Sequence, residues 1–98
     1  MTRYFFDIRD DFLSVTDTEG EECADLQKAG DRAATILCEI AGELPLNNGR
    51  SDVRATVRDV ANNVVFIATL NITGKTVEHP VRVEQRAGPR FAKKSAAF

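Results

Sequence analysis

The 98-residue chain has few of the side chains that most often carry out chemistry, with one histidine and two cysteines. Cys23 and Cys38 alone cannot form a disulfide framework or a four-ligand zinc site. No apolar run approaches the roughly 18 residues that a membrane span needs. The first ten residues also lack the basic flank and long apolar stretch of a secretory signal. We therefore expect a cytoplasmic protein with no membrane partner.

What the chain does have is an ordinary globular composition, with 43% apolar and 29% charged residues. This balance favours a folded core over disorder, and the length suits one small domain. From Gln85 onward the sequence has no hydrophobic period and contains four basic residues. We therefore predict one domain over residues 1–84 and a flexible, basic C-terminal tail over residues 85–98.

The net charge of −2 conceals an uneven distribution along the chain. Residues 1–49 contain four basic and eleven acidic residues, a net charge of −7, whereas residues 50–98 contain nine basic and four acidic residues, a net charge of +5. Two interpretations are open. Either the oppositely charged halves attract each other within one fold, or the second half forms a basic surface for an acidic partner. The acidic half argues against a general nucleic-acid binder.

Alternating apolar residues near the start predict a β-strand over Arg3–Arg9. On one face of this strand lie Tyr4, Phe6 and Ile8. Asp10-Asp11 is typical of a turn, and Phe12–Val15 could return as a short antiparallel strand. The polar residues 16–22 include a glycine and are predicted to form a loop.

The clearest periodic signal predicts an amphipathic helix over Leu26–Leu44. Its apolar sector comprises Leu26, Ala29, Ala33, Ile36, Leu37, Ile40, Ala41 and Leu44. Asp25 is a suitable N-cap, and Pro45 ends the helix because the residue before proline avoids the helical conformation. Gly30 and Gly42 lie near the apolar sector, where they lower helix propensity but allow a neighbouring element to approach closely.

The second half alternates in three runs, which predict strands over residues 53–58, 64–72 and 76–84. Residues 59–63 separate the first two runs and predict a hairpin turn. Pro80 interrupts the third run, so this strand is predicted to lie at an edge of the sheet.

The predicted order of elements is therefore β-β-α-β-β-β. Because one helix is available, we expect an antiparallel sheet of four or five strands that is covered on one face. The predicted fold class is α+β, a two-layer sandwich of this sheet and one amphipathic helix.

Apolar residues on both faces of the predicted sheet suggest an interaction surface. Phe5, Val65 and Ile67 are predicted on the uncovered face, where an apolar strip often marks a partner site. We expect a homodimer or a protein partner through this face or through the strand edge. The alternative is that the tail folds back over the face through Phe91 or Phe98.

Three arginines add a basic strip to this candidate surface. Arg54 and Arg58 share one strand face, and Arg82 could lie beside them on a neighbouring strand. Such a strip can contact phosphate groups, although a solvated charged face is the alternative. Phe5 is the one candidate for the aromatic platforms of a sheet-type RNA binder.

The sequence assembles no catalytic set. His79 follows Glu78, but adjacent strand residues point to opposite faces, so the carboxylate cannot orient the imidazole. Cys23 and Cys38 are best explained as small buried hydrophobes, and the acidic residues between 10 and 22 lack the ligand spacing of a calcium loop. No phosphate loop, dinucleotide fingerprint or serine elbow is present. We therefore expect no enzymatic activity, no catalytic residue, no cofactor and no metal.

Five short segments carry a family resemblance: Arg3-Tyr-Phe-Phe-Asp-Ile, Asp10-Asp11, Asp17-Thr-Glu-Gly, Asp25-Leu26 and Val57-Arg58-Asp59. They resemble a bacterial family of short proteins classed as a domain of unknown function. Its members open with RYFF, a variable residue, an aliphatic residue and a D-G turn, and continue into D-x-E-G before a helix. The resemblance covers residues 2–72 and departs at Asp11, where the family often has glycine. It implies a fixed loop at Asp17, Glu19 and Gly20, but no reaction.

A looser similarity concerns layout only. An acidic hairpin, a loop and a capped amphipathic helix are similar in arrangement to the partial double-stranded-RNA-binding fold of HicB-type antitoxins. The sequence therefore favours a small non-enzymatic protein-interaction module, homodimeric or bound to another protein. The alternative is a nucleic-acid-associated or antitoxin-like regulator that uses the basic sheet face and the tail.

Overall fold

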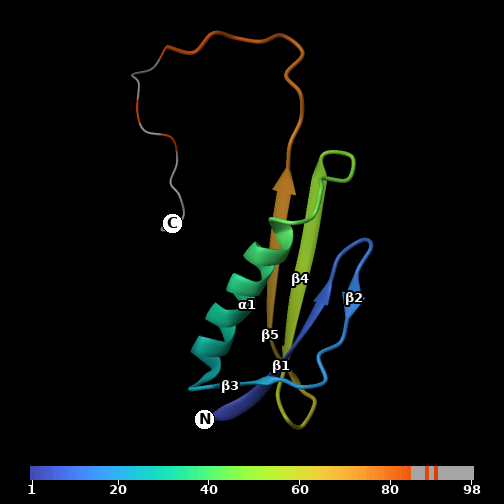
Figure 1. Cartoon of the computed structure of the whole chain (residues 1–98), viewed down its shortest axis with the longest axis vertical. Coiled ribbons are helices and arrows are strands. Elements are labelled where there is room, and N and C mark those ends of the chain that lie inside the picture. Colours follow the sequence, from blue (N-terminus) through green and yellow to red (C-terminus); the bar gives the residue numbers. More distant parts are fainter. Residues whose placement is uncertain (85–87, 89, 91–98) are drawn as a thin grey trace.

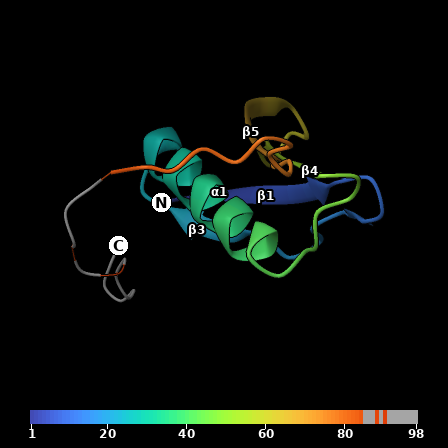
Figure 2. The ribbon, with the colours of Figure 1, turned by 90° about the horizontal axis from the view of Figure 1, so that it is seen from above.

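The computed structural model describes residues 1–84, 88 and 90 of the chain. Six elements follow one another (Figure 1): β1 Thr2–Arg9, β2 Ser14–Val15, β3 Glu21–Cys23, α1 Leu26–Ala41, β4 Arg50–Arg58 and β5 Val64–Thr73. All strand pairs are antiparallel. The helix α1 covers one face of the sheet (Figure 2), so the predicted two-layer α+β fold with one helix is confirmed.

The two sides of the sheet differ in how their outer strands are arranged. The strand order is β2-β1-β4-β5, and β3 also pairs with β1. β2 pairs with Ile8 and Arg9, whereas β3 pairs with residues 2–4. The segment from β2 to β3 therefore runs antiparallel along one side of β1 and leaves a gap between its two pairings. β5 forms the opposite edge.

The core lies between α1 and the central strands. Its buried strand side chains are Tyr4, Phe6, Ile8, Val53, Ala55 and Val57, and its buried helix side chains include Ala29, Ala33 and Leu37. These are the residues that the alternation of the strands and the helical period predicted. Asp25 caps the helix as predicted, because its carboxylate accepts the N–H of Lys28 at 2.9 Å.

The helix ends three residues earlier than predicted. Gly42 is the C-cap, and the following turn tightens, with the N–H of Glu43 donating to the carbonyl of Ile40 at 3.0 Å and that of Leu44 to Ala41 at 3.3 Å. These bonds span three residues rather than four, which is common where a helix finishes. Leu44 still packs against the core from this turn.

A glycine brings the helix close to β5, as the sequence predicted for this face. A Cβ atom added at Gly30 would lie 3.0 Å from the ring of Phe66. The aromatic ring therefore occupies the space that a side chain at this position would fill. This contact anchors α1 over the outer strand of the sheet.

The chain order is β-β-β-α-β-β, which differs from the predicted order at two places. β3 lies within the predicted loop. The strand predicted over residues 76–84 is wrong, because these residues form no strand and are exposed. The N–H of Gly74 donates to the carbonyl of Gly49 at 2.8 Å. The chain then continues away from the sheet (Figure 1) instead of turning back along β5.

The predicted tail, with Phe91 and Phe98, falls outside the described residues except for positions 88 and 90. The domain boundary at residue 84 therefore stays a prediction. Among the described residues, no helix has the length and apolar character to span a membrane.

Candidate interaction surfaces

The gap between β2 and β3 is closed by the carboxylate of Asp17. It accepts the backbone N–H groups of Phe6 at 3.0 Å, Glu19 at 3.0 Å and Gly20 at 3.1 Å. The N–H of Asp17 in turn donates to Oδ1 of Asp7 at 2.9 Å. One side chain therefore satisfies a strand N–H in this gap and fixes the loop that leads into β3.

Arg58 joins this loop to β4. Its guanidinium donates to both carboxylate oxygens of Asp7, at 2.7 and 3.0 Å, and to the carbonyl of Asp17 at 2.9 Å. The Arg58 and Asp7 side chains are 19% and 25% exposed. This bidentate ion pair links the acidic first half of the chain to the basic second half, as the first interpretation of the charge distribution expects.

The surroundings of both carboxyl groups favour their charged forms. The hydrogen bond from Arg58 is the main reason why the pKa of Asp7 is lowered, and burial opposes this effect. Burial also opposes ionisation of Asp17, but the N–H groups of Gly20, Phe6 and Glu19 outweigh it and lower the pKa of this carboxyl group. We call Asp7, Asp17 and Arg58 the edge network.

Two of the predicted surface residues belong to, or lie against, the edge network. Phe5 is half-buried on the uncovered face, with its ring centroid 5.1 Å from the guanidinium carbon of Arg58. Arg58 itself is engaged by Asp7 and Asp17. Sequence reasoning missed this role, although the strand alternation places Asp7 on the same face as Phe5.

Val65 does not lie on the uncovered face, contrary to the prediction. A β-bulge shifts the register between β4 and β5 at Val57 and Arg58, and Val65 becomes the extra residue on its strand. Val65 packs against the core cluster instead. Ile67 lies beyond the bulge, pairs with Thr56 and is 54% exposed on the predicted face.

Arg54 and Arg82 are not brought together. Arg54 is exposed on the uncovered face, in register with Arg9 of β1. Arg82 lies in the extended segment outside the sheet. Arg9 is thus the arginine that neighbours Arg54, and the alternation along β1, which places Arg9 on the face of Phe5, was the signal that could have identified it.

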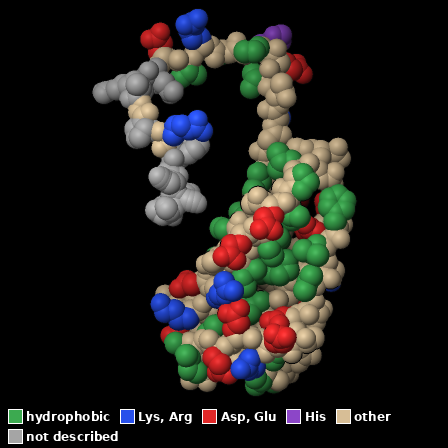
Figure 3. Space-filling model, viewed as in Figure 1, with side chains coloured by type: hydrophobic (Ala, Val, Ile, Leu, Met, Phe, Trp, Pro, Cys, Tyr) green, Lys and Arg blue, Asp and Glu red, His purple; other side chains and the backbone are tan. Residues whose placement is uncertain are grey.

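Both faces of the domain carry charges of both signs, because Lys28 and Arg32 lie on α1 and Asp7 and Asp52 lie among the arginines of the sheet. Acidic side chains are spread over the helix-bearing face (Figure 3), where Asp31, Glu39 and Glu43 are exposed. The arginines of β1 and β4 occupy the positions that alternate with the core residues and therefore lie on the uncovered face.

β5 presents the long open edge of the sheet. It contains ten residues, of which none is charged and none is proline. One side pairs with β4, and no described residue pairs with the other side. Its exposed large apolar side chains are Val64, Phe66, Ile67 and Ile72.

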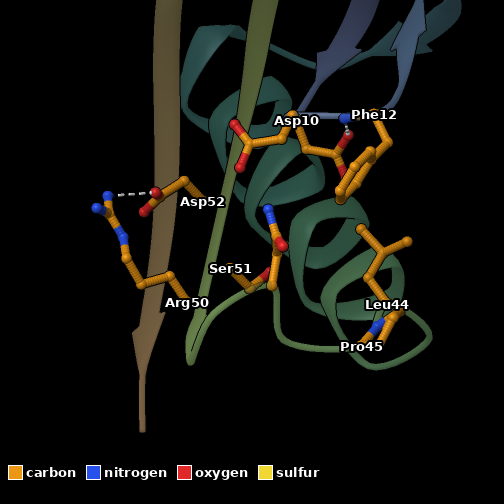
Figure 4. Close-up of a pocket in the computed structure, with 9 residues that line it drawn as sticks. Asp10, Phe12, Leu44, Pro45, Arg50, Ser51 and Asp52 are labelled. Atoms are coloured by element: carbon orange, nitrogen blue, oxygen red, sulfur yellow. Dashed lines mark hydrogen bonds and ion pairs between the residues drawn. The ribbon is translucent and has the colours of Figure 1, made fainter.

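A small hollow of about 30 Å³ lies where the turn after β1, the end of α1 and the start of β4 meet (Figure 4). Two charged groups at its rim already have partners, because Asp10 accepts the N–H of Phe12 and Arg50 pairs with Asp52, each at 2.7 Å. The volume suits about one or two water molecules. The hollow is therefore too small to enclose a substrate.

The cysteines and the histidine lie apart. Cys23 is buried as predicted, and burial, with a smaller contribution from Glu21, raises the pKa of its thiol. The prediction of a buried Cys38 is wrong, because this residue is exposed at the margin of the apolar sector of α1. His79 lies in the extended segment. Within the described residues, no three His, Cys, Asp or Glu side chains are grouped so that they could hold a metal ion.

Comparison with known proteins identifies a family without assigning an activity. No curated protein and no solved structure matches the chain. A family model described as a domain of unknown function, DUF6894, matches residues 3–71, which include the whole edge network. The chain therefore belongs to the DUF6894 family, a domain of unknown function.

Proposed function

We propose that the protein is a non-enzymatic interaction module that forms a homodimer by pairing β5 with β5 of a second copy. The observation that carries this proposal is the open edge of β5, which is ten residues long and has no charged residue or proline. Edge strands of monomers usually carry lysine, proline or a covering segment that prevents pairing. The bulge at Val57 and Arg58 interrupts the regular pairing at the start of β5, but the strand beyond it is regular.

The sequence of β5 suits antiparallel pairing with itself. With Thr69 on the twofold axis, Phe66 of one copy faces Ile72 of the other, and Ile67 faces Asn71. Paired residues then share a face, so apolar side chains meet on the helix-bearing side of a continuous sheet. No like charges meet in this register, because β5 has no charge.

The helix leaves room for a second copy beside β5. Gly30 faces Phe66 of β5, and Ala34 and Cys38 follow at four-residue intervals on the same side of α1. Both are exposed and small. A neighbouring helix on the joined sheet therefore meets short side chains rather than long charged ones.

The test is sedimentation velocity of the full chain over a hundredfold range of concentration. We expect the wild type to form a dimer and Thr69→Lys to shift it toward monomer, because two lysines would lie directly opposite each other on the axis. The matched control is Thr56→Lys, which places the same charge on the same face but one strand inside the edge.

Two outcomes would contradict the proposal. If the wild-type chain stays monomeric at every concentration, the proposed homodimer does not form. Equal dissociation by Thr56→Lys and Thr69→Lys would move the contact from the edge of β5 to the uncovered face of the sheet.

The nucleic-acid alternative has less support from the predicted basic strip. Arg58 is engaged by Asp7, and Arg82 lies outside the sheet, so Arg54 is the one of the three predicted arginines that remains exposed on the sheet face. Salt-titrated binding of the full chain to DNA and RNA tests this alternative, since phosphate contacts are strongest at low salt.

A further inference from the structure

Four polar side chains form one row across the uncovered face. The registers place Ser14 of β2 opposite Arg9 of β1, Arg9 opposite Arg54 of β4, and Arg54 opposite Thr69 of β5. Residues directly opposite each other in an antiparallel pair lie on the same face with Cβ atoms about 5 Å apart. Two arginines thus lie side by side between two hydroxyl groups. We call these four residues the arginine row.

The two central arginines differ from the others in β1 and β4. The remaining three each pair with a carboxylate, in Arg3–Glu22 at 3.1 Å, Arg50–Asp52 at 2.7 Å and Arg58–Asp7 at 2.7 Å. Among the described residues, no carboxylate forms an ion pair with Arg9 or Arg54. Because like charges opposite each other destabilise a strand pair, this arrangement costs free energy that a bound anion would recover.

The carboxylates nearest to the row in the sheet are already engaged. Asp7, two residues from Arg9, is held by Arg58, and Asp52, two residues from Arg54, is bonded by Arg50 and by the side-chain amide of Asn71. Their oxygens are therefore directed to other donors. The guanidinium groups of Arg9 and Arg54 keep their donors available for a ligand.

Shallow hollows flank the arginine row. One of about 210 Å³ is lined by Arg9, Ser14, Thr16, Arg54 and Thr56, among others. A second, of about 440 Å³, lies toward Thr69 and shares Arg9 and Arg54 with the first. Carboxylates also border these hollows, namely Asp7 in the first and Asp10, Asp11 and Asp52 in the second. A tetrahedral oxyanion over the two arginines has space on either side and hydroxyl groups at its margins. Of the bordering carboxylates, Asp7, Asp10 and Asp52 accept hydrogen bonds from other donors, and Asp11 is exposed.

We propose that Arg9 and Arg54 bind a phosphoryl group, with Ser14 and Thr69 as additional hydroxyl donors. Paired guanidinium groups match the oxygens of a phosphate monoester through charge-assisted bidentate hydrogen bonds. The site lies within a single copy and goes beyond the proposed dimer. It takes a free phosphate or the phosphate monoester of a larger small molecule.

The test is titration of the ¹⁵N-labelled full chain, followed by amide chemical shifts. The probes are inorganic phosphate, phenyl phosphate and a single-stranded oligonucleotide, each against sodium chloride of matched ionic strength. We expect saturable shifts at residues 9, 14, 54 and 69 with inorganic phosphate or phenyl phosphate. Which of these two binds more tightly distinguishes a free phosphate from a monoester.

Three variants make the test specific. Arg9→Gln and Arg54→Gln should each weaken binding about tenfold, because each removes charged hydrogen bonds to the anion. Arg3→Gln is the matched control, since it removes an arginine of the same face that is paired with Glu22 and lines neither hollow, and it should leave binding unchanged.

Three results would overturn the proposal. If sodium chloride reproduces the chemical-shift changes, they result from ionic strength and not from binding of phosphate. Equal weakening by Arg3→Gln and Arg54→Gln would show a diffuse basic surface. Shifts caused by the oligonucleotide but by neither inorganic phosphate nor phenyl phosphate would assign the row to a phosphodiester backbone.

Discussion

The two edges of the sheet differ in whether their backbone groups have partners. On the β1 side, β2, β3 and the carboxylate of Asp17 together complete the pairing of the strand. On the β5 side, the ten uncharged residues pair with β4 and have no described partner on their outer side. The comparison shows that the acidic residues of the first half hold a sheet edge together, whereas the edge without charge is the one available for another chain.

The largest effect is expected at Asp17. Asp17→Ala leaves the N–H groups of Phe6, Glu19 and Gly20 without their acceptor and should lower the free energy of unfolding by about 3 kcal/mol. Urea denaturation followed by circular dichroism measures this loss. The control Asp11→Ala alters an exposed carboxylate of the neighbouring turn and should change stability by less than about 0.5 kcal/mol. Equal losses would contradict the role of Asp17.

Gly20 tests the loop at the same edge. It has a φ of 75°, and an added Cβ would lie 2.9 Å from the carbonyl oxygen of Tyr4. Gly20→Ala should therefore cost about 2 kcal/mol, from the left-handed backbone and the contact with main chain. Gly42→Ala is the control, because Gly42 has a right-handed conformation and room for a methyl group. If Gly20→Ala leaves the free energy of unfolding unchanged, the loop can adapt to a side chain at this position, which would contradict a fixed loop.

A double-mutant cycle between Asp7 and Arg58 measures the link from this edge to β4. The pair is bidentate and largely shielded, so we expect a coupling energy of about 1–2 kcal/mol. The same cycle on the more exposed Arg50–Asp52 pair should show much weaker coupling. Similar coupling energies in both cycles would contradict a special contribution of the Asp7–Arg58 pair to stability.

The edge network also predicts a pH dependence of stability. Asp7 and Asp17 have pKa values below the ordinary 3.8 in the folded chain, so their stabilisation is fully present above that pH and is lost as the pH falls through the lower, folded values. Denaturation between pH 6 and pH 2 should show this loss. Asp7→Asn should flatten the curve below pH 4; a variant with the wild-type slope would contradict the assignment.

The smallest effect on folding is expected at the open edge. Ile67→Thr keeps a β-branched side chain at a position that is 54% exposed, so the free energy of unfolding at low protein concentration should change by less than about 0.5 kcal/mol. A loss above about 1 kcal/mol would show that β5 is already covered within one copy.

The layers of this fold could be predicted from the sequence because they depend on apolar periodicity. Phe6, Val57 and Leu37 lie in the core where a period of two or 3.6 places them. β3 was not predictable in this way, since Glu21 and Glu22 carry no apolar pattern. They pair with β1 through the backbone and through the ion pair between Arg3 and Glu22. The alternation over residues 76–84 predicted a strand that does not form, because an alternating pattern makes a strand only where a neighbouring strand is available for pairing.

The candidate surfaces were harder to predict than the core. Alternation assigned Phe5, Ile67 and Arg54 to the uncovered face, and the strand registers place all three residues there. The bulge moved Val65 to the core side, because one extra residue reverses the alternation that precedes it. The pairing of Arg58 with Asp7 and the register of Arg9 with Arg54 depend on which strands are neighbours, which periodicity does not encode.

Amide hydrogen exchange at low and high protein concentration compares the two edges most directly. The N–H of Phe6, which donates to Asp17, should be protected to the same degree at both concentrations. Alternate amides of β5 should exchange rapidly when the chain is dilute and become protected as its concentration rises. Protection of β5 that does not depend on concentration, or rapid exchange at both concentrations, would contradict self-pairing through this edge.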